Sequence, residues 1–191
     1  MEQTTPPSVS PEAFQQLLIT RHSIRRYTDR PVDPDNVTMI LQAALLAPTS
    51  KSARPWQFVV VENKDVLLSL SQCKPAGAHS LKTCAFAVVV CADAAASGMY
   101  PEDCAIAAEF MQLQAATMGI GSCWVQVRGR QTALAEPSED IVRETLGIPD
   151  NITVECIMTF GYPDEVRRPV DLEKLKWEKV HIANWRTEAA E

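Results

Sequence analysis

The chain has 191 residues, of which 46% are hydrophobic and 22% charged, and its formal net charge is -6. This composition is typical of a folded globular domain with a sizeable core. The acidic balance argues against a nucleic-acid-binding or membrane-surface protein, because the long-range field repels both partners.

Neither a membrane segment nor an export signal is expected. The longest apolar stretch, residues 85–96, is shorter than the roughly 20 residues that a spanning helix needs, and the N-terminus lacks the basic and apolar regions of a signal peptide. The six cysteines form no CxxC pair and lie mostly in apolar surroundings. We interpret them as reduced core residues, which favours a cytoplasmic location.

The predicted elements follow from helix caps and hydrophobic periodicity. Ser10 and Asp33 are suitable N-caps, each followed by a proline that fits a first helical turn. Pro48 ends the second helix. The β-branched runs at 57–61 and 86–90 are typical of buried strands. We expect helices over 10–20, 33–47, 64–72, 102–118 and 138–147, and strands over 57–61, 86–90, 122–127 and 155–160.

This order of helices and strands predicts an α/β or α+β domain around a small sheet. The helix from Glu102 to Met118 is apolar on nearly every side, which places it in the core or at a subunit interface. The polar, proline-punctuated tail from Gly161 onward resembles an arm lying over another surface. No internal repeat or linker divides the chain.

Several kinds of chemistry are missing from the sequence. There is no phosphate-binding GxxxxGK[ST] loop and no GxSxG nucleophile elbow. His22, His79 and His181 lie far apart, so we expect no metal site. An enzyme of this kind would take its chemistry from an organic cofactor, and we expect no catalytic side chain.

The stretch RHSIRRY, residues 21–27, gathers positive charge in an acidic chain. In an extended segment Arg21, Ser23 and Arg25 project to one side, where two guanidinium groups and a hydroxyl can bind one phosphate. A solvated basic turn is the alternative reading.

Three further stretches complete a pattern. The loop APTSKSARPWQF, residues 47–58, offers Thr49, Ser50 and Ser52 as hydrogen-bonding groups for a flat ligand. GIGSCWV, residues 119–125, brings a helix through a glycine turn into a strand, and VRRP, residues 166–169, adds late positive charge.

With these motifs in this order, the chain resembles the nitroreductase family of FMN-dependent enzymes from about Phe14 to Trp185. The resemblance implies an α+β sandwich with a central mixed, mostly antiparallel sheet flanked by helices, and an intertwined homodimer with two shared FMN sites. It implies a single domain over 1–191, in which residues 1–9 are flexible and residues 170–191 form a C-terminal arm on the partner subunit.

The resemblance also assigns residues near the FMN phosphate and ribityl chain. Arg21 and Ser23 would hold that end of the cofactor, and His22 would contribute through its backbone. Arg25 would contact either the phosphate or the pyrimidine edge of the flavin, where a cation favours the reduced anion. Arg168, or Arg167, would complete the phosphate clamp.

Other residues would line the flavin itself. Val125 and Gln126 match the strand whose backbone approaches flavin N5. Two positions depart from the family pattern, with Ser52 in place of asparagine and Arg54 in place of glutamine. The residues that would come from the partner chain are Pro48, Thr49, Ser50 and Ser52.

The implied reaction is ping-pong hydride transfer from NADH or NADPH through flavin N5 to a small electron-poor acceptor, such as a nitroaromatic or a quinone. Alternatives are a dehalogenase or flavin-fragmenting enzyme of the same fold, and a non-catalytic FMN carrier or sensor. A nucleic-acid module built on the arginines is the least favoured, because it requires aromatic and basic residues interleaved over a wide surface.

Overall fold

The computed structural model describes residues 9–183 and residue 185. The chain divides into two compact units, one made of the residues up to Thr20 and from Arg168 onward, the other of Arg21–Arg167. A single domain over 1–191 stays a prediction. The expected flexible segment 1–9 lies outside the described residues except for Val9, and the expected arm is described at 170–183 and 185.

The smaller unit contains helix α1 (Pro11–Thr20) and the C-terminal segment. Ser10 caps α1 as expected, its Oγ accepting a hydrogen bond from the Ala13 amide at 3.1 Å. The Val170 amide donates to the Ile19 carbonyl at 2.9 Å, which ties the C-terminal segment to α1. This segment carries two short 3-10 turns, at Leu172–Lys174 and Trp177–Lys179, and its large apolar side chains are exposed.

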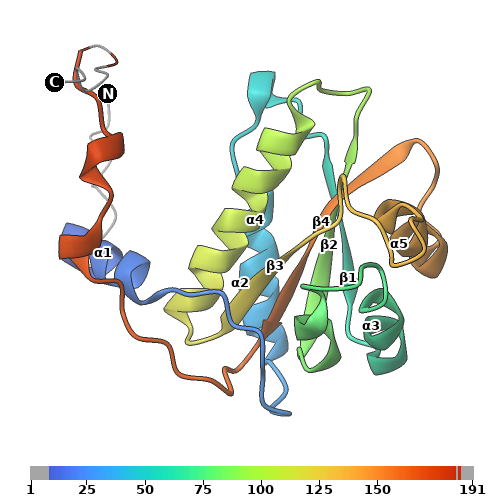
Figure 1. The fold of residues 1–191 in the computed structure, drawn as a ribbon, viewed down its shortest axis with the longest axis horizontal. Helices are drawn as coiled ribbons and strands as arrows, with labels where there is room; N and C mark the ends of the chain where they lie inside the picture. Colours follow the sequence, from blue (N-terminus) through green and yellow to red (C-terminus); the bar gives the residue numbers. More distant parts are fainter. Residues whose placement is uncertain (1–8, 184, 186–191) are drawn as a thin grey trace, which may run out of the picture. The chain divides into compact units, whose positions relative to one another are not determined.

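The larger unit is built on one four-stranded sheet in the order β1-β2-β4-β3 (Figure 1). All neighbouring strands are antiparallel. The only parallel pairing recorded in the described part of the chain is an isolated bridge between Ser23 and Ser122. The strands are β1 (Trp56–Val61), β2 (Phe86–Asp93), β3 (Gly121–Gln126) and β4 (Ile152–Gly161).

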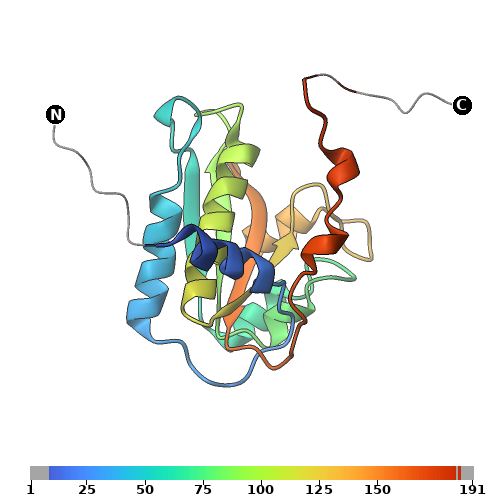
Figure 2. The same cartoon turned by 90° about the vertical axis from the view of Figure 1, so that its left-hand side faces the viewer.

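Helices cover both faces of this sheet, which confirms the expected α+β class. In Figure 1, α2 (Pro34–Leu45) and α4 (Tyr100–Thr117) lie to the left of the sheet, and α3 (Lys64–Leu70) and α5 (Ser138–Leu146) lie to its right. The turned view in Figure 2 again shows α2 beside α4. The two hydrophobic cores are centred on the α2 and α4 face and on the α3 and α5 face.

The position of β1 differs from the expectation. The expected buried strand at 57–61 forms, but it lies at the edge of the sheet, where Gln57 and Val60 are exposed. An apolar β-branched run has the same pattern at an edge as at the centre, so the sequence alone does not distinguish them. β2 and β4 occupy the centre and are buried almost throughout.

Helix α4 has a buried face and an exposed apolar face. Ala107 and Met111 are fully buried against the sheet, whereas Ile106 and Phe110 are 38% and 37% exposed. The sequence placed this helix in the core or at an interface, and its two faces suit both roles. None of the helices described is long and apolar enough to cross a membrane.

The arginine-rich segment 21–27 is seated on the sheet by two buried side chains, Ile24 and Tyr27. The Ile24 amide donates to the Ser122 carbonyl at 2.9 Å, and the Tyr27 hydroxyl lies 2.8 Å from Thr159 Oγ1. Glycines make this close approach possible. A Cβ on Gly121 would lie 2.8 Å from Ile24 Cγ1, and a Cβ on Gly161 would lie 3.0 Å from the Tyr27 ring.

The substitution Gly121→Ala tests this seating. The added methyl group has to displace Ile24, so we expect a loss of about 1–3 kcal/mol in the free energy of unfolding, as for other overpacked sites. Urea unfolding followed by circular dichroism measures it. Gly98→Ala is the matched control, because a Cβ there meets nothing within 4 Å. Equal stability of the two variants would contradict the close approach.

Candidate functional site

Arg21 is held against helix α4. Its Nη1 donates to Gln112 Oε1 at 3.4 Å, and its Nε lies 3.9 Å from Glu109 Oε1. Gln112 Nε2 donates to Glu109 Oε2 at 2.9 Å, and the buried Ser122 hydroxyl donates to Gln112 Oε1 at 3.3 Å. Glu109 is therefore paired within its own chain. Gln112 orients Arg21 and was not identified from the sequence.

The next two residues lie beside the start of β3. Ser23 forms the parallel bridge with Ser122 and is partly buried. His22 Nε2 is buried and has no hydrogen-bond partner among the described residues. A buried polar atom without a partner is uncommon in folded proteins and marks a place where a ligand or water completes the structure.

A carboxylate that the sequence analysis missed anchors Arg25. Glu165 Oε1 accepts from the Arg25 amide at 2.6 Å and from the Arg26 amide at 3.3 Å, and Arg167 Nη2 donates to Glu165 Oε2 at 2.6 Å. The Arg25 amide is the largest cause that holds the pKa of Glu165 below its usual value, and the nearby Arg167 lowers it further. The position of Glu165 directly before VRRP was the one sequence feature that could have indicated this role. Arg167 is thus engaged in an internal ion pair.

The Arg25 side chain itself is exposed, and its charge acts on Cys123 in strand β3. Burial raises the pKa of the Cys123 thiol, and the positive charge of Arg25 is the largest effect that opposes the rise. Arg21 meets α4 and Arg25 lies near Cys123. No hydrogen bond or ion pair joins Arg21, Ser23 and Arg25 to one another in the described part of the chain. All six cysteines are free and buried, as expected.

The loop around Thr49 and Ser50 has a strained backbone. Lys51, Ser52 and Arg54 all adopt left-handed conformations, with φ angles of 52°, 55° and 48°. Each such residue costs about 1–3 kcal/mol, and strain of this kind clusters at ligand-binding sites. Two side-chain oxygens accept hydrogen bonds from the loop backbone: Thr49 Oγ1 from the Arg54 amide at 3.0 Å, and Asp103 Oδ1 from the Ser50 amide at 2.8 Å. Pro48 and Ser52 are exposed.

Asp103, in the first turn of α4, is the anchor that sequence reasoning missed. It is only 2% exposed, and its second oxygen accepts from the Ser97 hydroxyl at 3.4 Å. In the sequence, an acidic residue in a first helical turn is explained by the helix dipole, so nothing indicated a role in the distant loop.

Helix α4 separates the two halves of the candidate site within one chain. Asp103 holds the Ser50 loop near the start of the helix, and Gln112 holds Arg21 further along it. Nine residues of helix correspond to about 14 Å along its axis. Among the described residues, no hydrogen bond or ion pair joins the loop to the arginine segment.

Strand β3 provides the remaining predicted residues. Val125 is fully buried, and the Gln126 side chain is used locally, its Oε1 accepting from Trp124 Nε1 at 2.8 Å. The Gln126 carbonyl accepts from Lys74 Nζ at 3.1 Å. Lys74 was not identified from the sequence, because nothing in its local pattern indicates a contact with β3. Arg168 belongs to the other unit of the chain.

The arrangement suits an anionic ligand with a flat polar part. Guanidinium groups and backbone amides are donors, and the buried His22 Nε2 without a partner can donate or accept. The described residues around them form no cluster able to hold a metal ion. A cation beside a hydroxyl binds phosphate, and a strained loop of small polar residues permits close contact with a planar ring.

Comparisons with known proteins agree with these features. The Nitroreductase family model matches residues 18–85 and 81–162. A putative NADH dehydrogenase/NAD(P)H nitroreductase of Archaeoglobus fulgidus is 34% identical over 91% of this chain and 99% of its own. A similar protein of Methanothermobacter thermautotrophicus is 32% identical over 87% of this chain and 84% of its own.

The solved structure of an FMN-dependent nitroreductase from Clostridium difficile R20291 matches with a TM-score of 0.87 and 42% identity, over 90% of this chain and 99% of that chain. The resemblance seen in the motifs is therefore confirmed, and this chain belongs to the nitroreductase family.

Proposed function

We propose that the protein is an FMN-dependent oxidoreductase that takes hydride from NADH or NADPH and passes it to an electron-poor acceptor, nitroaromatic or quinone-like, by a ping-pong mechanism. The 42% identity to an FMN-dependent nitroreductase supports the cofactor. The relatives named NAD(P)H nitroreductases support the electron donor. When bound, FMN accepts the hydride and releases the electrons. The protein's own residues bind FMN, orient it and set its midpoint potential.

The observation that carries this proposal is the rigid seating of the arginine segment. Ile24 and Tyr27 fix its backbone to the sheet, so Arg21 and Arg25 are presented from a fixed edge. Arg21 and Ser23 bind the FMN phosphate and ribityl end, with His22 contributing through its backbone. Preorganised cations bind an anion at a lower entropic cost than mobile ones.

Arg25 has a separate role in this proposal. Its positive charge acts on Cys123 in β3, the strand whose Val125 and Gln126 backbone follows the flavin. We assign it to the pyrimidine edge, with the phosphate as the alternative. Arg167 is already paired with Glu165, which favours Arg168 as the late arginine of the phosphate clamp.

The second half of each site comes from the partner chain of a homodimer. Pro48, Thr49, Ser50 and Ser52 of one copy would line the flavin held by the other, because within one chain helix α4 keeps the loop and Arg21 apart. The exposed apolar residues of α2 and α4 support such an interface, among them Leu45 at 56% exposed and Phe110 at 37%. The expected arm, described at 170–183 and 185, would then lie on the partner subunit.

The substitution Arg21→Ala tests the phosphate contact. A charge-assisted hydrogen bond contributes roughly 1.5–3 kcal/mol, so we expect FMN affinity to fall roughly ten- to a hundredfold. Fluorescence titration of flavin into the flavin-free protein measures it. Arg26→Ala, in the same segment but outside the proposed site, is the control. Unchanged FMN affinity together with a lower melting temperature would make Arg21 a structural residue.

Arg25→Gln separates the two roles of that residue. At the pyrimidine edge the cation stabilises the reduced anion more than the oxidised flavin, so the variant should have a lower midpoint potential. A differential loss of about 1.4 kcal/mol corresponds to roughly 30 mV for two electrons. Anaerobic potentiometric titration gives the value. An unchanged potential with weaker FMN binding would assign Arg25 to the phosphate.

Phe110→Asp tests the dimer. Burying a phenylalanine contributes roughly 1.5–3 kcal/mol, and a twofold interface loses this contribution twice, so the dimer dissociation constant should rise at least a hundredfold. Sedimentation velocity at micromolar concentration should show monomer with weakened FMN binding. Leu68→Asp on α3, 52% exposed and on the other face of the sheet, is the control. A monomer with full FMN affinity would exclude shared sites.

A further inference from the structure

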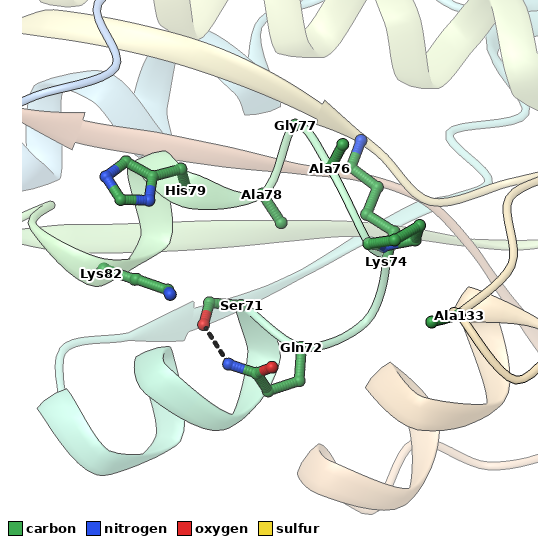
Figure 3. Close-up of a pocket in the computed structure, with 10 residues that line it drawn as sticks. Ser71, Gln72, Lys74, Ala76, Gly77, Ala78, His79, Lys82 and Ala133 are labelled. Carbon is green, nitrogen blue, oxygen red and sulfur yellow. Dashed lines mark hydrogen bonds between the residues drawn. The ribbon is translucent and has the colours of Figure 1, made fainter.

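Two adjoining cavities lie along the loop at residues 72–78 and share Lys74, Pro75 and Ala76. The first, which we call the Lys82 cavity, has a volume of about 220 Å³ and is also lined by His79 and Lys82 (Figure 3). The second, which we call the Arg130 cavity, has a volume of about 480 Å³ and is lined on its far side by residues of β3 and the turn after it, including Gln126 and Arg130.

The lining of both cavities has one sign of charge. Lys74, Lys82 and Arg130 contribute three cations, and no Asp or Glu lines either cavity. None of these three side chains forms an ion pair among the described residues. In a chain with a net charge of -6, unpaired cations gathered around shared space are stabilised when an anion binds between them.

Lys74 is held in place between the two cavities. The fully buried Ser138 hydroxyl donates to the Cys73 carbonyl at 2.6 Å, which fixes the backbone beside Lys74. Lys74 Nζ donates one hydrogen bond, to the Gln126 carbonyl at 3.1 Å. An ammonium group has three donors, so two stay available for a ligand. In Figure 3 the Lys74 side chain extends beside Ala76, and the Lys82 amino group lies toward Ser71.

The surroundings of Lys74 disfavour its ammonium form relative to a lysine in water. Burial lowers its pKa, and the positive charge of Arg130 acts in the same direction. An anion in either cavity would offset both effects, because it stabilises the ammonium form.

The Arg130 cavity borders Gln126, on the strand proposed to follow the flavin, where the nicotinamide has to approach. We propose that the two cavities together bind the diphosphate of the nicotinamide dinucleotide, with one phosphate group in each cavity and Lys74 between them. A diphosphate carries two adjacent anionic groups, which matches two adjoining cavities that share one lysine. The assignment rests on the proposed function and makes Lys74 a specificity-determining residue for the electron donor.

The experiment compares two donors in the FMN-loaded enzyme: NADH, and dihydronicotinamide riboside, which has no phosphate. Lys74→Gln should raise the KM for NADH roughly tenfold, the loss of one charge-assisted contact, and leave the KM for the riboside unchanged. Arg130→Gln should act in the same direction. Lys174→Gln is the charge-matched control, because Lys174 is 82% exposed and lies far along the chain from both cavities.

A binding measurement independent of turnover accompanies the kinetics. Calorimetric titration of inorganic pyrophosphate into the FMN-loaded protein should show binding that Lys74→Gln weakens about tenfold. If the unsubstituted protein does not bind pyrophosphate, the proposed anion site is wrong. This result does not depend on turnover, so it is distinguishable from a failure of the proposed function, in which neither donor is oxidised.

Two kinetic outcomes would overturn the diphosphate assignment specifically. Equal increases in KM for both donors, or loss of bound flavin in Lys74→Gln, would show that Lys74 acts on the flavin or on folding. An unchanged KM for NADH, with a raised KM for 4-nitrobenzoate but not for uncharged nitrobenzene, would show that the cavities bind an acidic acceptor instead.

Discussion

Helix α4 sets the distance between the two parts of the candidate site that one chain carries. Asp103 near its start holds the strained loop at Ser50, and Gln112 further along holds Arg21. The buried Met111 face keeps the helix on the sheet, so this separation of about 14 Å along the axis is not adjustable. In the proposed function a site that uses both groups combines two copies of the chain, and the exposed Phe110 side of the same helix is the surface proposed for that association.

The close contact of the arginine segment with the sheet connects the fold to binding. Gly121 and Gly161 leave space for Ile24 and Tyr27, and this contact fixes the backbone from which the basic side chains extend. Glu165 accepts hydrogen bonds from two amides of the same segment and so compensates part of its charge. The backbone that carries the cations is therefore held in place before any ligand binds, which reduces the cost of binding an anion.

The sequence predicted those features that depend on neighbouring residues. Caps at Ser10 and Asp33 located the first two helices, and the motif around Arg21 identified the family. Features that depend on distant residues were missed. Asp103 contacts Ser50 across 53 positions, Glu165 contacts Arg25 across 140, and Lys74 contacts Gln126 across 52. Each of these three residues has an ordinary local explanation as a helix-dipole, turn or surface charge, so only the folded chain shows its partner. The edge position of β1 was missed for a related reason, because strand order is not encoded in a local apolar run.

The central claim is that each FMN site combines the arginine segment of one chain with the loop of the other, and a mixed dimer tests it most directly. One chain carries Arg21→Ala and the other Ser52→Trp, which fills the loop, and each variant alone should bind FMN weakly. The mixed dimer is purified through different tags. One of its sites then combines the Arg21→Ala segment with the Ser52→Trp loop, and the other combines an unsubstituted segment with an unsubstituted loop. We predict one FMN per dimer, bound with the affinity of the unsubstituted protein. A mixed dimer in which no site has that affinity would contradict the claim, because it would show that each site is built within a single chain.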